Sequence, residues 1–464
     1  MATPYDEFAY PATTFRQTHP NRLSTLAALF GLPYAPVDCC RVLDIGCGDG
    51  VNIIAMAVTQ PGSTFVGFDL AEAAIARGLE IVATLGLTNV RLETRDLTEA
   101  DYGRGGFDYV IAHGLYSWVP AAARDALLAS VRHHLAPNGV GFVSHNTLPG
   151  GRMRQVVREM VLFHIRGVEG VGARLGAARA QLARMLEFFA EQTPLHAQIR
   201  HECRHMLDRA PGALAHDELG EVFDPLYLHE FIAAAGRHGL QYLTEAGASR
   251  CGEGFRPPYA LDDPAFDVLA HAQELDFQAL RAYRENLVVH AGVAINRRPD
   301  PSRLFDLYVA SPAIEAEPGV FDVRGRRFNA EEAHLTEVVR RIDAAWPQAL
   351  PVSSLIDDVE RAGVLLRMHW LELLDLQTAP WPITVTVGER PRVSPLTRLQ
   401  AARGGPWLTT PSHATVEIND DRGLRFIAGL DGARTLDEIA ADAAVSRAQV
   451  VEKLQELARL ALLV

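Results

Sequence analysis

The sequence predicts an α/β protein in which a parallel sheet carries helices on both faces. Three observations support this fold class. Apolar runs typical of strands alternate with helical patterns between residues 41 and 148. The first run, at 41–45, leads into a glycine-rich turn, and the second, at 64–69, ends in the acid Asp69. This order is typical of a sheet whose connecting helices cover both of its faces.

Residues 1–38 precede the first strand and contain Tyr5, Tyr10 and His19. A helix capped by Asn21 follows and ends near Gly31. We interpret the segment as a lid or strap that closes over a ligand at the glycine-rich turn. The alternative is that these residues only pack on the surface.

The glycine-rich turn runs from Asp44 to Gly50 and opens a helix at about 50–59. Glycine tolerates positive φ and the close approach of a ligand, so the turn favours a nucleotide-like guest. Asp69 ends the next strand, where a carboxylate accepts hydrogen bonds from a ribose. The alternative is a tight turn that binds no ligand.

Two features distinguish this turn from a phosphate cradle. It lacks both the GxGxxG spacing and a G-K-[ST] sequence. Asp44 would also repel a pyrophosphate, whereas it suits the cationic amino-acid end of S-adenosylmethionine (SAM). The pattern D-x-G-x-G-x-G, formed by Asp44, Gly46, Gly48 and Gly50, resembles the first motif of the class I SAM-dependent methyltransferases.

This resemblance implies a Rossmann-like sheet, SAM as cofactor and a set of binding residues. Asp96, in the loop after the strand at 88–93, takes the place of the acid that binds the adenine amino group; alternatively it caps a turn. The predicted cofactor residues are Asp44, Gly46, Cys47, Gly48, Gly50, Asn52, Asp69, Leu70, Asp96, Leu97, His113, Tyr5, Tyr10 and His19.

Further strands are predicted at 107–112 and 139–145, with helices at 71–85 and 120–135. Ligands bind at the carboxyl ends of such strands, so the residues that follow them face the transferred methyl group. We predict five catalytic candidates there: His113, Tyr116, Trp118, His145 and Asn146. The alternatives are that the aromatic residues only cover the strand edge and that His113 packs beneath the loop.

Residues 151–212 read as helical and interrupt the expected order of elements. The missing elements follow as a helix at 225–235 and strands at 240–244 and 286–291. An apolar helical insertion favours burial against a second copy, so we predict a homodimer. The alternative is that the insertion only caps the sheet.

Four stretches make the resemblance more specific: 116–120, 144–150, 225–231 and 275–277. Together they resemble bacterial methyltransferases that carry a regulatory domain after the catalytic one. That group includes rickettsial-type lysine methyltransferases acting on outer-membrane proteins. The resemblance covers residues 5 to 300 and implies a protein lysine as acceptor.

Beyond a linker at 299–301 we predict strands at 304–309 and 319–328, helices at 331–345, 352–361 and 363–375, and a wing at 383–387. Helices at 435–440 and 446–462 resemble a winged-helix unit, but the last one mixes acidic and basic residues and offers no basic face for DNA. The predicted domains are 1–148 (SAM-binding core and lid), 149–220 (insertion), 221–298 (rest of the core), 299–390 and 391–464 (accessory α+β domains for substrate docking or protein interaction).

The amino-acid composition limits the partners and the compartment that we expect for this protein. The 464 residues include 44 basic and 57 acidic ones, a net charge of −13, which disfavours nucleic acid and favours basic or neutral substrates. We see no signal peptide and no apolar run of membrane length, so we expect a cytoplasmic protein without membrane insertion. None of the five cysteines has C-x-x-C spacing, and we expect no metal.

Three functions agree with these observations. Methyl transfer from a sulfonium needs alignment and desolvation of the acceptor rather than a metal. The first hypothesis is a SAM-dependent N-methyltransferase of protein lysines, whose ammonium, with pKa ~10.4, costs about 4 to 5 kcal/mol to hold neutral at pH 7. The alternatives are an N- or O-methyltransferase of a peptide or small-molecule natural product, and a regulatory protein that binds SAM as a signal.

Overall fold

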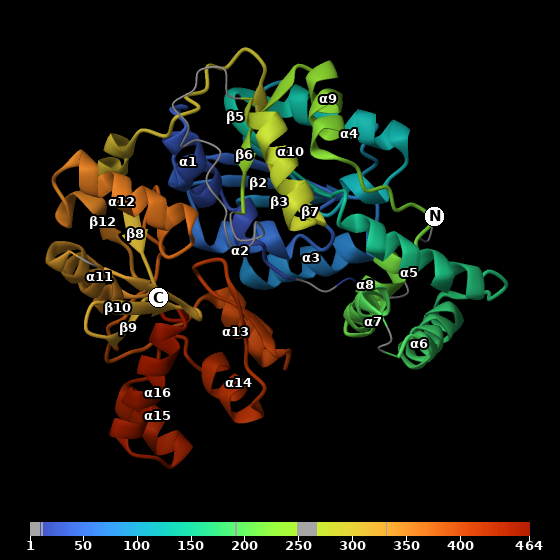
Figure 1. Ribbon diagram of the computed structural model, residues 1–464. Coiled ribbons are helices and arrows are strands. Elements are labelled where there is room, and N and C mark those ends of the chain that lie inside the picture. The colour runs from blue at the N-terminus through green and yellow to red at the C-terminus, as the bar shows by residue number, and fades with distance from the viewer. Residues whose placement is uncertain (1–9, 11–12, 191–192, 248–266, 331) are drawn as a thin grey trace.

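The computed structural model describes residues 10, 13–190, 193–247, 267–330 and 332–464. At its centre lies a seven-stranded sheet with the strand order β3-β2-β1-β4-β5-β7-β6 (Figure 1). The strands are β1 Arg41–Ile45, β2 Thr64–Asp69, β3 Val90–Thr94, β4 Phe107–Ala112, β5 Leu135–Asn146, β6 Leu240–Glu245 and β7 Tyr283–His290. Strand β7 is antiparallel to both of its neighbours, whereas β1 to β5 run parallel. The predicted fold class is confirmed.

Helices cover both faces of the sheet because its strands bury side chains on each. Tyr109 and Ile111 of β4 pack with helices α1 to α3, whereas Val110 and Ala112 pack with α4 and α9. The helices are α1 Pro20–Leu29, α2 Val51–Thr59, α3 Glu72–Leu85, α4 Ala121–His134 and α9 Leu228–Arg237. The glycine-rich turn therefore lies on the face covered by α1 to α3.

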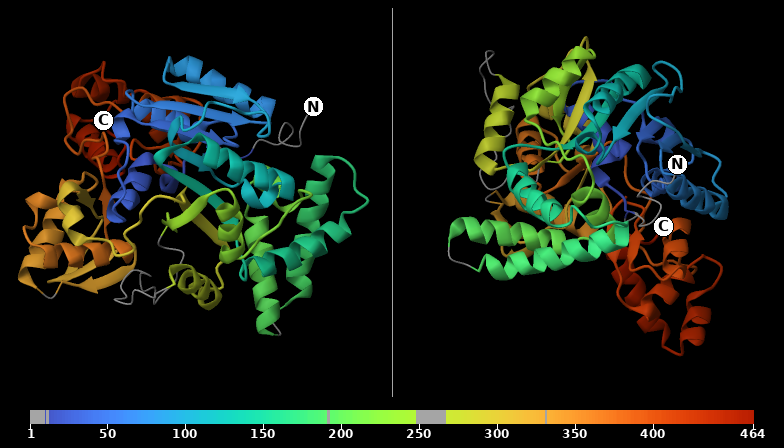
Figure 2. Two further views of the ribbon diagram at one scale, coloured as in Figure 1. Left: turned by 90° about the horizontal axis from the view of Figure 1, so that it is seen from above. Right: turned by 90° about the vertical axis from the view of Figure 1, so that its right-hand side faces the viewer.

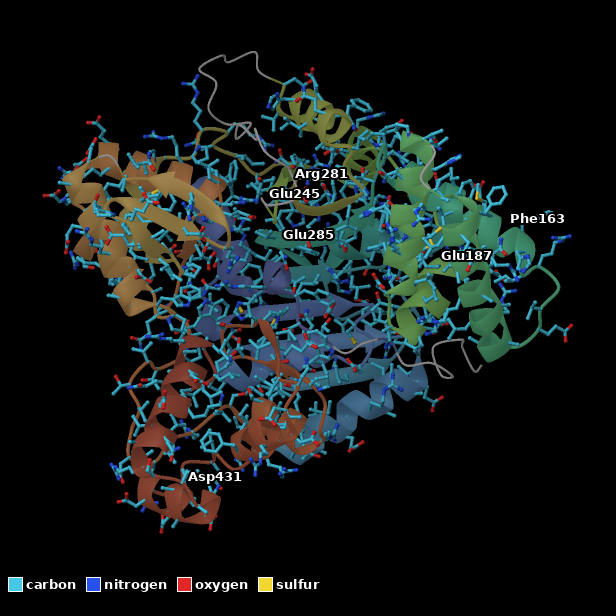
Figure 3. The ribbon with its side chains drawn as sticks, turned by 60° about the horizontal axis from the view of Figure 1, so that its bottom comes forward. Phe163, Glu187, Glu245, Arg281, Glu285 and Asp431 are labelled. Atoms are coloured by element: carbon cyan, nitrogen blue, oxygen red, sulfur yellow. The ribbon has the colours of Figure 1, made fainter. Side chains whose placement is uncertain are left out.

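A buried group of ion pairs joins α10, Val268–Ala279, to the two last strands of the sheet. Asp276, which is fully buried, lies 2.7 Å from the Nε atoms of both Arg281 and Arg284. Arg284 also contacts Glu245 at 2.8 Å. Figure 3 labels Glu245 and Arg281 of this group. Because these charges are paired within the protein, they fix β7 and hence the position of its first residue at the sheet edge.

Residues 151–218 form a helical insertion with a core of its own. Its elements are α5 Gly151–His164, α6 Val171–Phe188, α7 Pro194–Leu207, α8 Pro211–Ala213 and a π-helix Leu214–Glu218. Val157, Leu182 and Cys203 are buried in this core. The insertion lies at one end of the molecule and residues 299–464 at the other (Figures 1 and 2). The predicted helical insertion is confirmed.

The segment after the sheet shares a core with α1. Phe30 packs against Trp370 with 6.3 Å between ring centroids, and both belong to the cluster that fills the space between α1 and the sheet. The elements are β8 Tyr308–Ala310, β9 Ile314–Glu317, β10 Val320–Val323, β11 Arg326–Asn329, α11 Ala333–Ala345, β12 Leu350–Pro351, α12 Val359–Trp370 and β13 Asp375–Gln377. Helix α1 therefore packs between the central sheet and the segment that follows the sheet.

The last segment has a separate core. Its elements are α13 Pro395–Ala402, β14 Trp407–Thr409, β15 Thr415–Glu417, α14 Asp421–Ala428, α15 Leu436–Ala443 and α16 Arg447–Arg459. In the part of the chain that the structure describes, no helix combines the length and the apolarity needed to cross a bilayer.

Three predictions in this half were wrong. The first half of the strand expected at 304–309 belongs to a 3-10 helix, Pro301–Asp306. The helices expected at 352–361 and 363–375 are replaced by α12 after a short 3-10 turn. Residues 383–387 form no strand: Thr384 donates its N–H to Leu463 O, and Pro380 and Pro382 cannot donate to a ladder. Tertiary contacts outweighed the apolar alternation there.

Candidate functional site

The glycine-rich turn folds back onto β2. Gly46, Gly48 and Gly50 have φ values of 72°, 60° and 73°, which side chains strongly disfavour. Asp69 accepts the Gly48 N–H through Oδ2 at 2.8 Å and the Ala71 N–H through Oδ1. A Cβ atom at Gly50 would lie only 2.7 Å from a methyl carbon of Leu92. The turn therefore keeps its shape only with glycine.

Asp44 lies beneath this turn and is 3% exposed. Burial raises the pKa of its carboxyl group from 3.8 to about 7, the Asp69 charge adds to the rise, and a hydrogen bond with Asn52 opposes it. A buried carboxylate of this kind gains stability when a cation binds beside it. The site therefore fits the ammonium group of SAM.

Tyr10 and residues 13–19, which we call the strap, lie near the carboxyl ends of the strands. The Tyr10 hydroxyl donates to Asp217 in the insertion at 3.3 Å, and the Phe15 ring stacks on His113 with 3.8 Å between centroids. The Phe15 N–H donates to Asn52 Oδ1 at 3.1 Å. The strap thus connects the insertion to the cofactor turn.

His19 ends the strap as a packed residue. Its Nδ1 accepts the Asn21 N–H at 3.0 Å, which caps α1, and its Nε2 lies 2.8 Å from Gln60 Nε2. Both ring nitrogens are therefore used inside the protein. Tyr5 lies outside the described residues, and its role in a lid stays a prediction.

The predicted adenine and ribose residues lie along the ends of β2 and β3. Leu70 is 59% exposed next to Asp69, and Leu97 is partly buried. Asp96 Oδ1 accepts both the N–H of Thr98, at 2.7 Å, and its hydroxyl, at 2.6 Å, so this carboxylate caps its own turn. These bonds lower the pKa of Asp96 and hold it ionised.

His113 contacts a tyrosine that sequence reasoning missed. The Tyr283 hydroxyl donates to Ser144 Oγ at 2.7 Å and lies 3.3 Å from His113 Nε2. Ser144 Oγ also accepts the Gly114 N–H at 2.7 Å. Tyr283 opens β7, and an antiparallel strand brings its first residue to the carboxyl ends of its parallel neighbours, so topology was the signal that would have found it.

Trp118 and Asn146 meet around Arg154 of α5. The Arg154 guanidinium lies 5.0 Å from the Trp118 ring centroid and 5.1 Å from that of Phe223. It donates to Asn146 Oδ1 at 3.0 Å and to Glu218 at 2.5 and 3.1 Å. This corner of the site holds a cation between aromatic rings and a buried carboxylate.

Glu218 and its neighbour Asp217 come from the π-helix that ends the insertion. Glu218 is 2% exposed and also contacts Arg209 at 3.1 Å, while Asp217 pairs with Arg209 and accepts from Tyr10. A π-helical turn is rare and often accompanies a functional site. Here it brings two carboxylates to the same corner.

Tyr116 and His145 lie on the opposite face of the sheet, against Phe231 of α9. Successive residues of a strand point to opposite faces, so His145 points away from Ser144 and Asn146. His145 is 1% exposed and burial lowers its pKa to about 3. Tyr116 lines a separate cavity of about 460 Å³ with Arg124 and Arg237. The structure does not bring these two to the corner formed by Trp118.

Among the described residues, one group has the spacing of metal ligands: Asp101, His133 and His134. His134 Nε2 already accepts the Tyr102 N–H at 3.2 Å, and its Nδ1 lies 2.9 Å from Ser130 O. These bonds tie the loop before β4 to the end of α4. Hydrogen bonds within the protein therefore explain why these three side chains lie close together.

Comparison with known proteins gives two family matches. Residues 37–205 match a methyltransferase domain, and residues 210–290 match a predicted methyltransferase regulatory domain. The second match contains β6 and β7, the strands that complete the sheet. Residues 291–464 lie outside both.

Two uncharacterized proteins of Rickettsia prowazekii are among the relatives. RP789 is 34% identical over 301 residues, which cover 63% of this chain and 54% of the relative, so the chain spans about half of that protein. RP028 is 35% identical over 240 residues, which cover 52% of this chain and 96% of the relative.

The solved structure of PKMT2 from Rickettsia typhi has the same fold along the whole chain. It aligns with a TM-score of 0.85 at 24% identity, covering 98% of this chain and 100% of PKMT2. PKMT2 in complex with AdoHcy aligns with a TM-score of 0.83 at 24% identity, covering 98% and 99%. The likeness therefore includes the two segments after the sheet.

Proposed function

Since this chain belongs to the class I SAM-dependent methyltransferases that carry a methyltransferase regulatory domain, we propose that its acceptor is the side-chain amine of a protein lysine. Family membership establishes SAM as the cofactor and methyl transfer as the reaction. The acceptor, the roles of the individual residues and the assembly of the protein are the proposal.

In the proposed cofactor site, Asp44 binds the ammonium group of SAM and Asp69 the ribose hydroxyls. Asp96, Leu97 and Leu70 border the adenine. SAM supplies the electrophilic methyl group on its sulfonium. Asp44 supports this arrangement because its buried carboxylate has no cationic side chain among the groups that shift its pKa.

One observation carries the proposed acceptor: the corner formed by Trp118, Phe223 and Glu218 already binds the guanidinium of Arg154. A lysine ammonium needs the same aromatic faces and carboxylates when it enters next to Arg154. The net charge of −13 favours a basic substrate. PKMT2, whose fold this chain shares, is a lysine methyltransferase, which supports this acceptor.

The acceptor nitrogen must be neutral when it attacks, because its lone pair forms the new bond to the methyl carbon as the bond from that carbon to sulfur breaks. We propose that His113 and Tyr283 receive the proton that the ammonium loses. Their contact at 3.3 Å and the Phe15 ring stacked on His113 place this pair beneath the strap, which excludes water.

We also propose that the insertion joins two copies of the chain. It exposes apolar side chains away from the sheet: Phe163 is 68% exposed and Phe188 80% exposed (Figure 3 shows Phe163 at the outer edge). Substitution of both by aspartate is expected to halve the mass measured by light scattering. A wild-type protein that is already monomeric would contradict this assembly.

The acceptor class is tested by transfer of a labelled methyl group from SAM into a lysate of the source organism, separated into protein and small-molecule fractions. The Asp44→Asn protein serves as the control for background label. We expect label in discrete protein bands. Label only in the small-molecule fraction would favour a natural-product substrate, and SAM binding without any transfer would favour a regulatory role.

A further inference from the structure

The last segment of the chain, residues 391–464, reaches the cofactor turn. The loop between β14 and β15 inserts His413 beside α2, and Thr415 lies 3.2 Å from Thr14 of the strap. Helix α13 runs near α2 (Figure 1), and Arg403 pairs with Glu80 of α3 at 2.6 Å. Both family matches end before this segment.

The loop holds His413 in a strained conformation. Its φ is +59°, in the left-handed region that residues with a side chain rarely adopt. Its N–H donates to Thr410 O at 2.9 Å, and the side chain is 2% exposed. The ring packs at 4.9 Å from His19 and its Nε2 lies 2.9 Å from Asn52 Oδ1. The strained turn thus aims one ring nitrogen at Asn52.

Phe15 and His413 together orient the Asn52 amide. Oδ1 accepts from His413 Nε2 and from the Phe15 N–H, whereas Nδ2 donates to Thr18 Oγ1 at 3.0 Å and faces the Asp44 carboxylate. A flipped amide would place its own N–H group against the Phe15 N–H and would require the other tautomer of His413. His413 therefore helps to keep the amide nitrogen of Asn52 directed at Asp44.

We propose that His413 is a positioning residue for SAM, which acts through Asn52 to hold the Asp44 carboxylate ionised and directed at the cofactor ammonium. The last segment of the chain is then part of the cofactor site rather than only a docking module. By linkage, bound SAM also stabilises the contact of this segment with α2.

Several titratable or charged groups surround Asp44, Asn52 and His413, which we call the relay. Asp69 of β2 and the Cys47 thiol face Asp44 together with Asn52. His19 and Arg16 of the strap face His413, whose pKa is lowered to about 3 by burial, with a smaller contribution from Arg16. His413 is therefore neutral above pH 5, and Asp44 is the group of the relay that titrates near neutrality.

The test compares two substitutions of His413 by calorimetric titration with SAM between pH 5.5 and 8. Asparagine tolerates the left-handed region but is too short to reach Asn52, whereas the amide nitrogen of glutamine reaches as far as Nε2. We expect His413→Asn to weaken SAM binding about tenfold, the loss of one buried hydrogen bond, and to move its pH midpoint upward. His413→Gln restores binding to within about threefold. At saturating SAM both variants keep the wild-type kcat.

Arg403→Ala is the matched control, because it removes an exposed contact between the same segment and α3 without touching Asn52. It is expected to leave the Kd for SAM unchanged. Equal loss in Arg403→Ala and His413→Asn would overturn the proposal, and so would wild-type affinity in His413→Asn. If His413→Asn does not fold, the Asn52→Leu variant replaces it: in that background His413→Gln must leave SAM affinity unchanged, and a further loss would refute the relay.

Discussion

Replacement of Asp44 by asparagine is expected to weaken SAM binding at least about 100-fold and to remove a pH-dependent cost from the free energy of folding. Burial raises the pKa of this carboxyl group from 3.8 to about 7. A shift of this size corresponds to about 4 kcal/mol when the group is ionised. The site keeps this unfavourable charge because the cofactor ammonium binds against it.

The two pH dependences have opposite signs. An acid with a raised pKa binds more protons in the folded state, so the apoprotein loses stability as pH rises from about 4 to 7 and carries the full cost above 7. Between pH 5 and pH 8 this one group is expected to lower the free energy of unfolding by about 3 kcal/mol. SAM affinity rises over the lower part of the same range because Asp44 must be ionised to bind the ammonium.

Urea titration of the wild-type apoprotein and of Asp44→Asn at pH 5 and pH 8 measures the pH dependence of the free energy of unfolding. The difference between the two proteins gives the contribution of Asp44. Calorimetry at pH 8 measures the affinity for SAM, and we expect it to be at least about 100-fold weaker in the variant. If the variant keeps the pH slope of the wild type, or binds SAM within about threefold, the role given to Asp44 is wrong.

Three further substitutions test the acceptor side. Trp118→Ala is expected to lower kcat at least about tenfold, by loss of one aromatic face for the ammonium, with SAM affinity kept; unchanged turnover would remove Trp118 from the site. Tyr283→Phe removes the hydroxyl near His113 and is expected to lower kcat about 100-fold, and an unchanged pH profile of kcat would speak against its role with the proton. Glu218→Gln removes one of the two buried carboxylates that pair with Arg154 and Arg209 and leaves only Asp217 beside them, so urea titration should show a loss of about 3 kcal/mol; wild-type stability would contradict that.

The sheet and the cofactor turn were predictable because their signals are local. The apolar runs of β1, β2 and β4 have the expected bounds, and the glycines of the turn have the positive φ that motivated their assignment. Asp44 also lies where the motif puts it, buried beneath the turn.

The acceptor corner was less predictable because it depends on which way each side chain points. Asn146 and His145 are adjacent in sequence, yet the alternation of the strand sends them to opposite faces, and counting from buried Val143 would have revealed this. Arg154, Phe223 and Glu218 meet there only because the insertion folds back on the sheet. No local pattern indicates such a return.

The contact between Asn52 and His413 joins residues 361 positions apart. It depends on how a separate segment packs beside α2, and the apolar periodicity of that segment specifies its own core but not its neighbour. The accessory role predicted for residues 391–464 therefore did not include the cofactor site.

The identity of the methylated atom tests the central claim most directly. After transfer of labelled methyl groups to the protein fraction, acid hydrolysis and chromatography of the amino acids separate the possible products. Our account predicts that the label elutes with lysine methylated on its ε-nitrogen and is absent when the Asp44→Asn protein is used. Label that is lost on mild base treatment as a methyl ester, or that elutes with methylated arginine or histidine, would contradict it.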